Sequence, residues 1–250
     1  MSIQSLVQKG KIGNLELKNR IVMPPMGVGV GDGSGYVTEK DIAYYEARAK
    51  GGVGLIVSAC CSITPELCGM ASFTDPNLSL PGVEEGFKKL MDRVHQHGTK
   101  MIIQLLHMGR QGVSMLNNGQ QVVAPSAIPE NDFMDTPREL TNEEVKFLIN
   151  AYVKAAKVVL DAGADGVELH CAHGYLIHQF ISARANKRTD ESGGSFENRY
   201  RFATDIVKAI KEACGEDYPV SLRYSVESKM KGFCEGAMPG EDYVEVGRNM

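Results

Sequence analysis

The sequence predicts an α/β fold built on parallel strands, and three observations support this. Short apolar segments alternate with amphipathic helical segments five times along the 250 residues. The segment 53–57 (VGLIV) is apolar throughout, as expected for a strand buried on both faces. With 43% hydrophobic and 23% charged residues, a chain of this length can bury one substantial core.

The N-terminal segment predicts a hairpin, a short strand and a loop. Residues 11–20 (KIGNLELKNR) alternate in character around Gly13, which predicts a hairpin that closes one end of the main fold. The strand 21–23 ends at Pro24, because proline cannot donate to a continuing ladder. The Gly-rich segment 28–36 lacks a G-K-[ST] sequence and the strand-to-helix context of a dinucleotide fold, so a surface loop is favoured over a phosphate loop.

The next part of the chain contains a capped helix and two further strands. Thr38 and Asp41 form a capping-box pattern for a helix that reaches Ala49 and ends at two glycines. The elements that follow are a strand at 53–57, a helix at 83–97 and a strand at 100–106 that carries Gln104.

The C-terminal half repeats the alternation after a long loop. Residues 108–139 contain three prolines and little periodicity, which is typical of a functional loop over one end of a fold. Thr141 and Glu144 form a second capping box. The predicted elements are a helix from 141 to 162, a strand at 166–169, a helix from Ser195 to Gly215, a strand at 219–224 and a last helix that begins at Pro239 or Gly240.

These patterns leave two architectures open. The spacing of the units is irregular and without self-similarity, which excludes a solenoid. Five strands are fewer than the eight of a closed barrel, whose usual length is ~250 residues or more. The chain is therefore either an open doubly wound sheet or the front part of a longer polypeptide.

Charge and cysteine usage narrow the class of protein. The net charge of −4 gives no basic excess, so neither nucleic acid nor an anionic membrane is indicated as a partner. The six cysteines form no C-x-x-C pair, which argues against a zinc ribbon and a disulfide framework. No apolar run approaches the ~20 residues of a membrane span. We expect a cytoplasmic protein that acts on small molecules.

A cluster of side chains that can donate protons follows the strand 166–169. His170, Cys171, His173 and Tyr175 come at its C-terminal end, where parallel barrels place their chemistry. The two histidines could be catalytic donors, packed core residues or, with Cys171, metal ligands. Cys171 points away from His170 if the strand continues, which weakens the metal interpretation. Tyr175 could be a general acid or could pack under the following turn.

Four segments carry a resemblance to a known family. They are PPMG at 24–27, GGVGLIV at 51–57, QLLHMGR at 104–110 and the stretch from Glu168 to Phe202. In order and spacing they resemble the old yellow enzyme family of FMN-dependent ene reductases. Within it, RYSVESKMKGF at 223–233 is most similar to the clostridial 2-enoate reductase and 2,4-dienoyl-CoA reductase branch.

The resemblance implies a TIM (β/α)8 barrel with FMN at its C-terminal mouth. Residues 1–250 would be the N-terminal part of this single FMN-binding barrel, with its first five strands and part of the fifth helix. The phosphate site of such barrels follows the last two strands. A 4Fe-4S cluster, FAD and NADH-binding domains are expected only in polypeptide that continues beyond this sequence.

The resemblance also implies a reaction and its catalytic residues. The protein would be an NADH-linked ene reductase that transfers hydride from FMN to the β-carbon of an α,β-unsaturated carboxylate, thioester or carbonyl compound. His170 and His173 match the donor pair for the activating oxygen, and Tyr175 matches the donor of a proton to the α-carbon. A phenol, with an ordinary pKa of ~10, is protonated at neutral pH and suits that role.

The resemblance implies a cofactor-binding set as well. Arg223 would stabilise the negative edge of reduced FMN, and Gln104 would pair with its pyrimidine edge unless it is a satisfied core amide. The remaining members are Pro25, Met26, Gly27 and Cys60. Two of these depart from the family: relatives often have Thr or Cys in place of Gly27, and Gly or Ala in place of Cys60.

Other interpretations stay open, and some matching residues have structural explanations. A flavin NADH oxidase or demethylase on the same barrel, or a non-catalytic flavin electron-transfer module, is an alternative function. An aldolase barrel is disfavoured because no strand lysine stands at a Schiff-base position. A homo-oligomer is possible. We expect structural hydrogen bonds and ion pairs from His107, Arg110, Arg188, Asn198 and Arg199.

Overall fold

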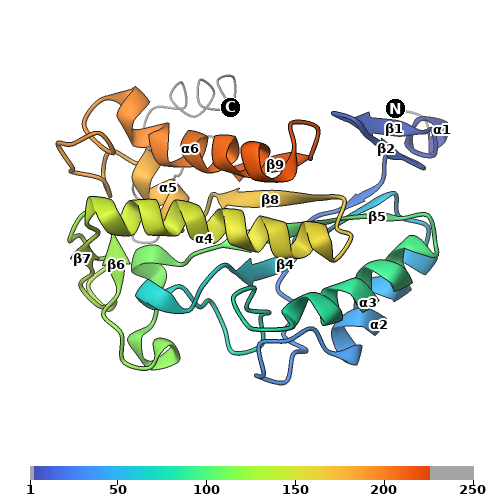
Figure 1. Ribbon diagram of the computed structural model, residues 1–250, viewed down its shortest axis with the longest axis horizontal. Helices are drawn as coiled ribbons and strands as arrows, with labels where there is room; N and C mark the ends of the chain where they lie inside the picture. Colours follow the sequence, from blue (N-terminus) through green and yellow to red (C-terminus); the bar gives the residue numbers. More distant parts are fainter. Residues whose placement is uncertain (1–2, 226–250) are drawn as a thin grey trace.

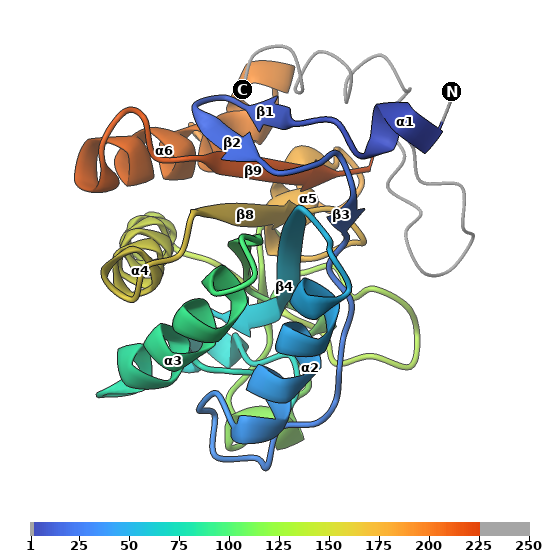
Figure 2. The ribbon, with the colours of Figure 1, turned by 90° about the vertical axis from the view of Figure 1, so that its right-hand side faces the viewer.

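Five parallel strands form one curved sheet in the computed structural model, which describes residues 3–225. Their order is β3-β4-β5-β8-β9, and each strand pairs in parallel with its neighbours. The strands are β3 (Val22–Met23), β4 (Leu55–Ser62), β5 (Lys100–Leu106), β8 (Gly166–Cys171) and β9 (Val220–Tyr224). Seen from the side, they form an arc that makes half of a barrel (Figure 2). The predicted parallel α/β fold is confirmed, and the part of the fifth helix predicted from Pro239 or Gly240 lies outside the described residues.

Four helices cover the outer face of the arc (Figures 1 and 2). They are α2 (Glu39–Lys50), α3 (Val83–His95), α4 (Asn142–Asp161) and α6 (Phe196–Cys214). Both capping boxes are present: Asp41 N–H and Glu144 N–H donate to the hydroxyls of Thr38 and Thr141, and each carboxylate accepts from its N-cap backbone. Each box satisfies two backbone donors that the first turn leaves unpaired.

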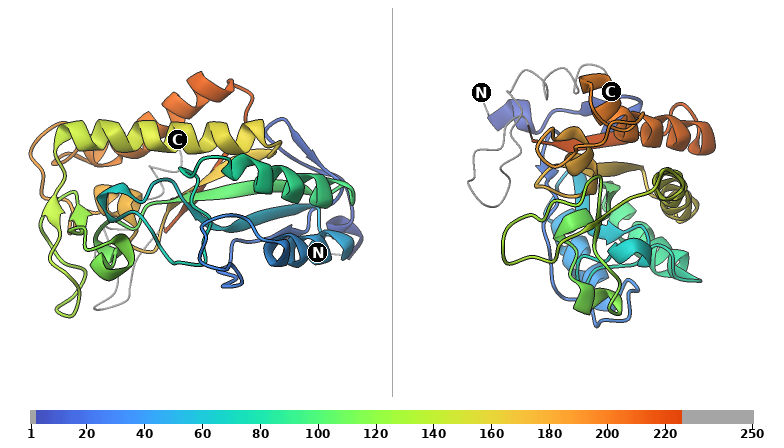
Figure 3. Two further views of the ribbon diagram at one scale, coloured as in Figure 1. Left: turned by 60° about the horizontal axis from the view of Figure 1, so that its bottom comes forward. Right: turned by 90° about the vertical axis from the view of Figure 1, so that its left-hand side faces the viewer.

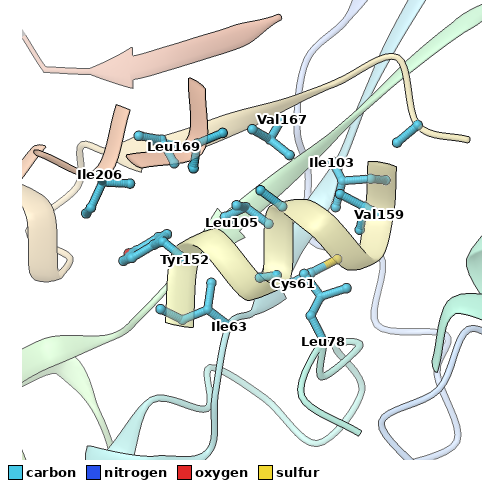
Figure 4. Close-up of a cluster of buried hydrophobic side chains, with 14 of the residues drawn as sticks. Cys61, Ile63, Leu78, Ile103, Leu105, Tyr152, Val159, Val167, Leu169 and Ile206 are labelled. Carbon is cyan, nitrogen blue, oxygen red and sulfur yellow. The ribbon is translucent and has the colours of Figure 1, made fainter. Parts of the chain in front are cut away.

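The main hydrophobic core lies between the strands and these helices. Met101, Ile103 and Leu105 of β5 point into it, together with Val167 and Leu169 of β8. Figure 4 shows several of these side chains packed beside α4. Because strand side chains alternate, the intervening residues face the opposite side, which is the interior of the half-barrel.

The predicted hairpin closes one end of that interior. It consists of β1 (Gly10–Ile12) and β2 (Leu15–Leu17), an antiparallel pair joined through Gly13 at φ +53°. Leu15 and Leu17 pack against Leu55, Val57 and Ile102 from the interior face of the sheet. Figure 1 places this hairpin and helix α5 (Leu176–Ile181) at opposite ends of the molecule.

Several elements were not predicted from the sequence. The loop 108–139 contains two 3₁₀ turns, η2 (Gly109–Gln111) and η3 (Ser114–Asn117), and a two-stranded sheet of β6 (Val123–Ala124) and β7 (Arg138–Glu139). Strand β4 continues to Ser62 through a register shift after Val57, whereas the prediction ended at 57. The other additions are α1 (Ile3–Leu6), η1 (Glu66–Cys68) and α5. Figure 3 shows the long loop beyond the end of the sheet.

No helix within residues 3–225 is both long and apolar enough to cross a bilayer.

Candidate active site

Three aromatic rings meet where β8 ends. The ring centroids of His170 and Tyr175 are 4.7 Å apart, those of His170 and His173 are 4.9 Å apart, and all these contacts are edge to face. His170 is buried, Tyr175 is half-buried and His173 is exposed. The structure therefore brings together the three side chains predicted to donate protons.

A tight turn with left-handed backbone produces this arrangement. His173 has φ +57° and Gly174 has φ +79°, and Tyr175 N–H donates to Ala172 O at 3.2 Å. Glycine adopts such a conformation without steric cost, whereas histidine does so rarely. The turn reverses the chain, so Tyr175 comes back beside His170 and becomes the N-cap residue of α5.

His170 is a neutral hydrogen-bond donor. Its Nδ1 accepts a hydrogen bond from Ala172 N–H at 3.3 Å, which assigns the ring proton to Nε2. Burial, followed by the nearby His173 and the charge of Arg223, lowers the pKa of His170 to about 3. Burial and Arg223 also lower the pKa of His173. Both rings are thus kept uncharged while retaining one N–H to donate.

His178 and Gln179 of α5 hold the turn in place through hydrogen bonds. Neither residue was predicted from the sequence. Gln179 Nε2 donates to Gly174 O at 2.6 Å and to Met108 O at 3.1 Å, while its Oε1 accepts from Arg110 N–H at 3.1 Å. His178 Nδ1 accepts from Gly174 N–H at 2.8 Å. The signal for them was two polar residues in the apolar run LIHQFI, whose six residues are all buried. A buried polar side chain there needs partners.

Arg223 lies beside the cluster on the neighbouring strand. It is opposite His170 in the register between β8 and β9, and its side chain is half-buried. Its charge lowers the pKa values of both His170 and His173. The guanidinium is therefore electrostatically close to the predicted oxygen-binding donors.

A row of four side chains crosses the interior face two residues before His170 and Arg223 on their strands. Cys60, Gln104, Glu168 and Ser221 are register partners on β4, β5, β8 and β9. Gln104 Nε2 donates to Glu168 Oε1 at 2.7 Å, and Ser221 Oγ donates to Glu168 Oε2 at 3.2 Å. Burial raises the pKa of Glu168, and the hydrogen bonds from Gln104 and Ser221 oppose it. Sequence reasoning missed Glu168 and Ser221.

Cys60 is a protonated thiol at the edge of this row. Its Sγ donates to Asp75 Oδ2 at 3.9 Å. Burial and the carboxylate of Asp75 raise the pKa of Cys60 to about 12. Such a thiol is a poor nucleophile at neutral pH, so its environment favours a packing role over a chemical one.

The predicted segment 25–27 is not packed against the other site residues. It leaves β3, whose parallel pairing with β4 places it at the same end of the sheet. Met26 is 59% exposed, and a Cβ built on Gly27 would meet no atom within 4 Å. The space beside Gly27 is therefore open.

The metal interpretation of His170, Cys171 and His173 finds no support in the geometry. Cys171 is buried in the core between the sheet and the helices, away from the ring cluster. Across residues 3–225, no three His, Cys, Asp or Glu side chains are grouped to hold a metal ion.

The basic residues expected to be structural make structural contacts. Arg188 donates to Leu140 O at 2.5 Å and to Pro125 O at 3.3 Å, tying the long loop to the chain after α5. Arg110 forms a buried ion pair with Glu130. Arg199 donates to Ile181 O at 2.9 Å.

The interior residues fit the polar edge of a flavin. Gln104 uses its amide nitrogen on Glu168, and its Oε1 accepts no hydrogen bond from any residue in 3–225. Arg223 supplies a cation on the same face of the sheet, and the neutral His170 and His173 supply N–H donors. An acceptor and a cation suit a ring that carries an N–H group and becomes negative on reduction, and the two N–H donors remain for an oxygen of a molecule bound beside it.

Known proteins are similar to this chain along most of its length. A sequence profile described as the NADH:flavin oxidoreductase / NADH oxidase family matches residues 6–248. An NADH oxidase of Thermoanaerobacter brockii is 43% identical over 233 residues, which are 91% of this chain and 35% of that protein. A cinnamate reductase of Clostridium sporogenes is 42% identical over 246 residues, which are 96% of this chain and 37% of that protein. The chain thus spans about a third of the length of these two curated relatives.

Solved structures show the same arrangement of strands and helices. A 2-naphthoyl-CoA reductase in complex with 2-naphthoyl-CoA superposes with a TM-score of 0.89 at 32% identity, over 98% of this chain and 38% of that chain. An old yellow enzyme from Pichia sp. superposes with a TM-score of 0.88 at 31% identity, over 98% of this chain and 66% of that chain. The five strands correspond to the N-terminal part of this TIM barrel.

Proposed function

Because this chain belongs to the NADH:flavin oxidoreductase / NADH oxidase family, we propose that it is the catalytic barrel of an FMN-dependent, NADH-linked ene reductase. Its substrates would be α,β-unsaturated carboxylates, thioesters or carbonyl compounds. The observation that carries the proposal is the ring cluster at the end of β8, where the neutral donor His170 lies beside His173 and Tyr175. A cinnamate reductase and a naphthoyl-CoA reductase among the similar proteins support this substrate class.

In the addition of hydrogen across a C=C bond, different residues of this chain would act on different atoms of the substrate. Bound FMN would supply the hydride that reaches the β-carbon. His170 Nε2–H and His173 would donate to the activating oxygen, where negative charge grows as that hydride arrives. Tyr175 O–H would deliver the proton to the α-carbon, and solvent would return a proton to the phenol. Neutral histidines suit the first role because they can donate without giving up the proton.

The cofactor would rest against the interior face of the half-barrel. Gln104 would meet its pyrimidine edge and Arg223 its negative edge, with Cys60 and the segment 25–27 beside the ring. Glycine in place of the Thr or Cys of relatives leaves only backbone contact from Gly27. The cytoplasmic location, a possible homo-oligomer and a role for FAD and a 4Fe-4S cluster in polypeptide beyond residue 250 stay predictions.

An anaerobic half-reaction experiment tests the proposal. The full-length protein is reduced with NADH under argon, and cinnamate, an enone or an enoyl thioester is then added. We expect flavin absorbance to bleach with NADH and to return on addition of at least one of these alkenes, with the saturated product formed. Flavin that bleaches but is not reoxidised by any of them would exclude the ene reductase.

An NADH oxidase is the second candidate, favoured by the 43% identity to the enzyme of that name from Thermoanaerobacter brockii. The two functions differ in the electron acceptor. Reoxidation by oxygen at a catalytically useful rate, without reoxidation by any alkene, would identify the oxidase. A demethylase or a non-catalytic electron-transfer module would show neither product.

A further inference from the structure

The buried pair of Gln104 and Glu168 lies in the centre of the interior face. Gln104 is 2% exposed and Glu168 is 7% exposed, and they are register partners on adjacent strands. Their sequence neighbours Ile103, Leu105 and Leu169 point into the core on the other side of the sheet. The pair is therefore placed below the ring cluster and on the same side as Arg223.

The carboxylate dictates how the Gln104 amide is turned. An ionised carboxylate only accepts hydrogen bonds, so the amide must present its nitrogen to it. The distance of 2.7 Å from Gln104 Nε2 to Glu168 Oε1 is that of a charge-assisted hydrogen bond. Ser221 Oγ donates to the second oxygen, Oε2. The amide oxygen of Gln104 is consequently directed away from Glu168 as an acceptor.

We propose that Glu168 is a positioning residue that turns the Gln104 amide so that its oxygen accepts the N3–H of the flavin. This inference rests on the proposed function. The pyrimidine edge of an oxidised flavin has one donor, N3–H, between two carbonyl oxygens. With the amide turned the other way, two N–H groups would oppose each other, so the orientation fixed by Glu168 determines whether this contact attracts or repels.

A comparison of two flavins in three proteins distinguishes an effect of Glu168 on the orientation of the Gln104 amide from a general structural effect on the site. Apoprotein of the full-length wild type, Glu168→Gln and Ser221→Ala is titrated with FMN and with 3-methyl-FMN, which lacks the N3–H donor. Flavin fluorescence gives Kd for each combination. The ratio of the two Kd values is the penalty of methylation, and a general loosening of the site would weaken both flavins alike and leave the ratio unchanged.

We expect wild type to show a penalty of roughly tenfold or more, the effect of leaving a buried polar atom unpaired. In Glu168→Gln the new amide can offer either nitrogen or oxygen, so Gln104 is free to turn and the penalty should fall to about threefold or less. Ser221→Ala is the matched control, because it removes the bond to Oε2 and leaves Oε1 with Gln104. Its penalty should equal that of wild type.

Equal penalties in wild type and Glu168→Gln would overturn the inference while leaving FMN binding intact. A wild-type protein that binds neither flavin would overturn both this inference and the proposed function. Where circular dichroism shows that Glu168→Gln is unfolded, Glu168→Asp replaces it, since the shorter side chain withdraws the carboxylate from Gln104. A penalty in that variant as large as in wild type would also overturn the inference.

Discussion

His170 and Tyr175 meet edge to face, with ring centroids 4.7 Å apart and ring planes at 84°. Five positions separate them in the sequence, and the left-handed backbone of His173 and Gly174 brings them together. In the proposed reaction the two side chains act on adjacent parts of one substrate, the activating oxygen and the α-carbon. Their separate removal should therefore have different kinetic signatures.

Replacing His170 with alanine should slow the transfer of hydride to the alkene by ~10²-fold to 10³-fold, the usual loss for one donor to a developing oxyanion. Flavin reduction by NADH should be largely unchanged, because no activating oxygen is involved in that step. Stopped-flow spectroscopy of the two half-reactions makes the measurement. His95→Ala is the matched control, since His95, at the end of α3, pairs with Asp165 outside the ring cluster. Equal slowing of both half-reactions, or loss of FMN, would contradict the donor role.

Replacing Tyr175 with phenylalanine should slow the oxidative half-reaction with alkenes and preserve the ring packing against His170. Because the phenol O–H is the proton source, the solvent isotope effect of wild type should be lost or changed in Tyr175→Phe. Measurement of alkene reduction in H₂O and in D₂O tests this. Tyr200→Phe on α6 is the control, with its ring packed against Phe196. An unchanged rate in Tyr175→Phe would assign the proton to another donor.

The free energy of unfolding should fall as the pH is lowered from about 7 to about 5. Burial lowers the pKa of His107 to about 4, of His170 to about 3 and of His178 to about 4. Unfolded histidines titrate near pH ~6.5, so below that pH the unfolded state binds more protons. The stabilisation is complete above ~6.5 and is lost as the pH falls toward the folded pKa values.

Each of these histidines contributes at most ~1.4 kcal/mol per pH unit within that window. Urea unfolding at several pH values measures the slope. His107→Asn keeps an acceptor for Gly109 N–H, which His107 Nδ1 binds at 3.1 Å, and should reduce the slope by about a third. A stability that is flat from about pH 7 to about pH 5 would show that these rings titrate normally.

The sequence was sufficient for features that depend on nearby residues. Both capping boxes, the hairpin at Gly13 and the strand that carries His170 follow from patterns within a few positions. It was insufficient for contacts that depend on the register between strands far apart in the sequence. In the sequence, Glu168 is one polar residue in an apolar strand. Its contact with Gln104, 64 positions earlier, depends on the register between β5 and β8. The short parallel pair β6–β7 was missed for the same reason.

Gln179→Glu should destabilise the protein and distort the turn that carries His173. The substitution keeps the shape of Gln179 but replaces its amide nitrogen, which donates to Gly174 O and Met108 O, with a carboxylate oxygen. Two carbonyls would then face a buried negative charge without a donor, which costs ~1–3 kcal/mol or more. Thermal unfolding monitored by circular dichroism measures the loss, and Gln96→Glu is the control, because Gln96 is the exposed C-cap residue of α3. Because the turn fixes His173, alkene reduction should fall more than flavin reduction by NADH in the folded fraction. Stability equal to that of the control would show that Gln179 does not hold the turn.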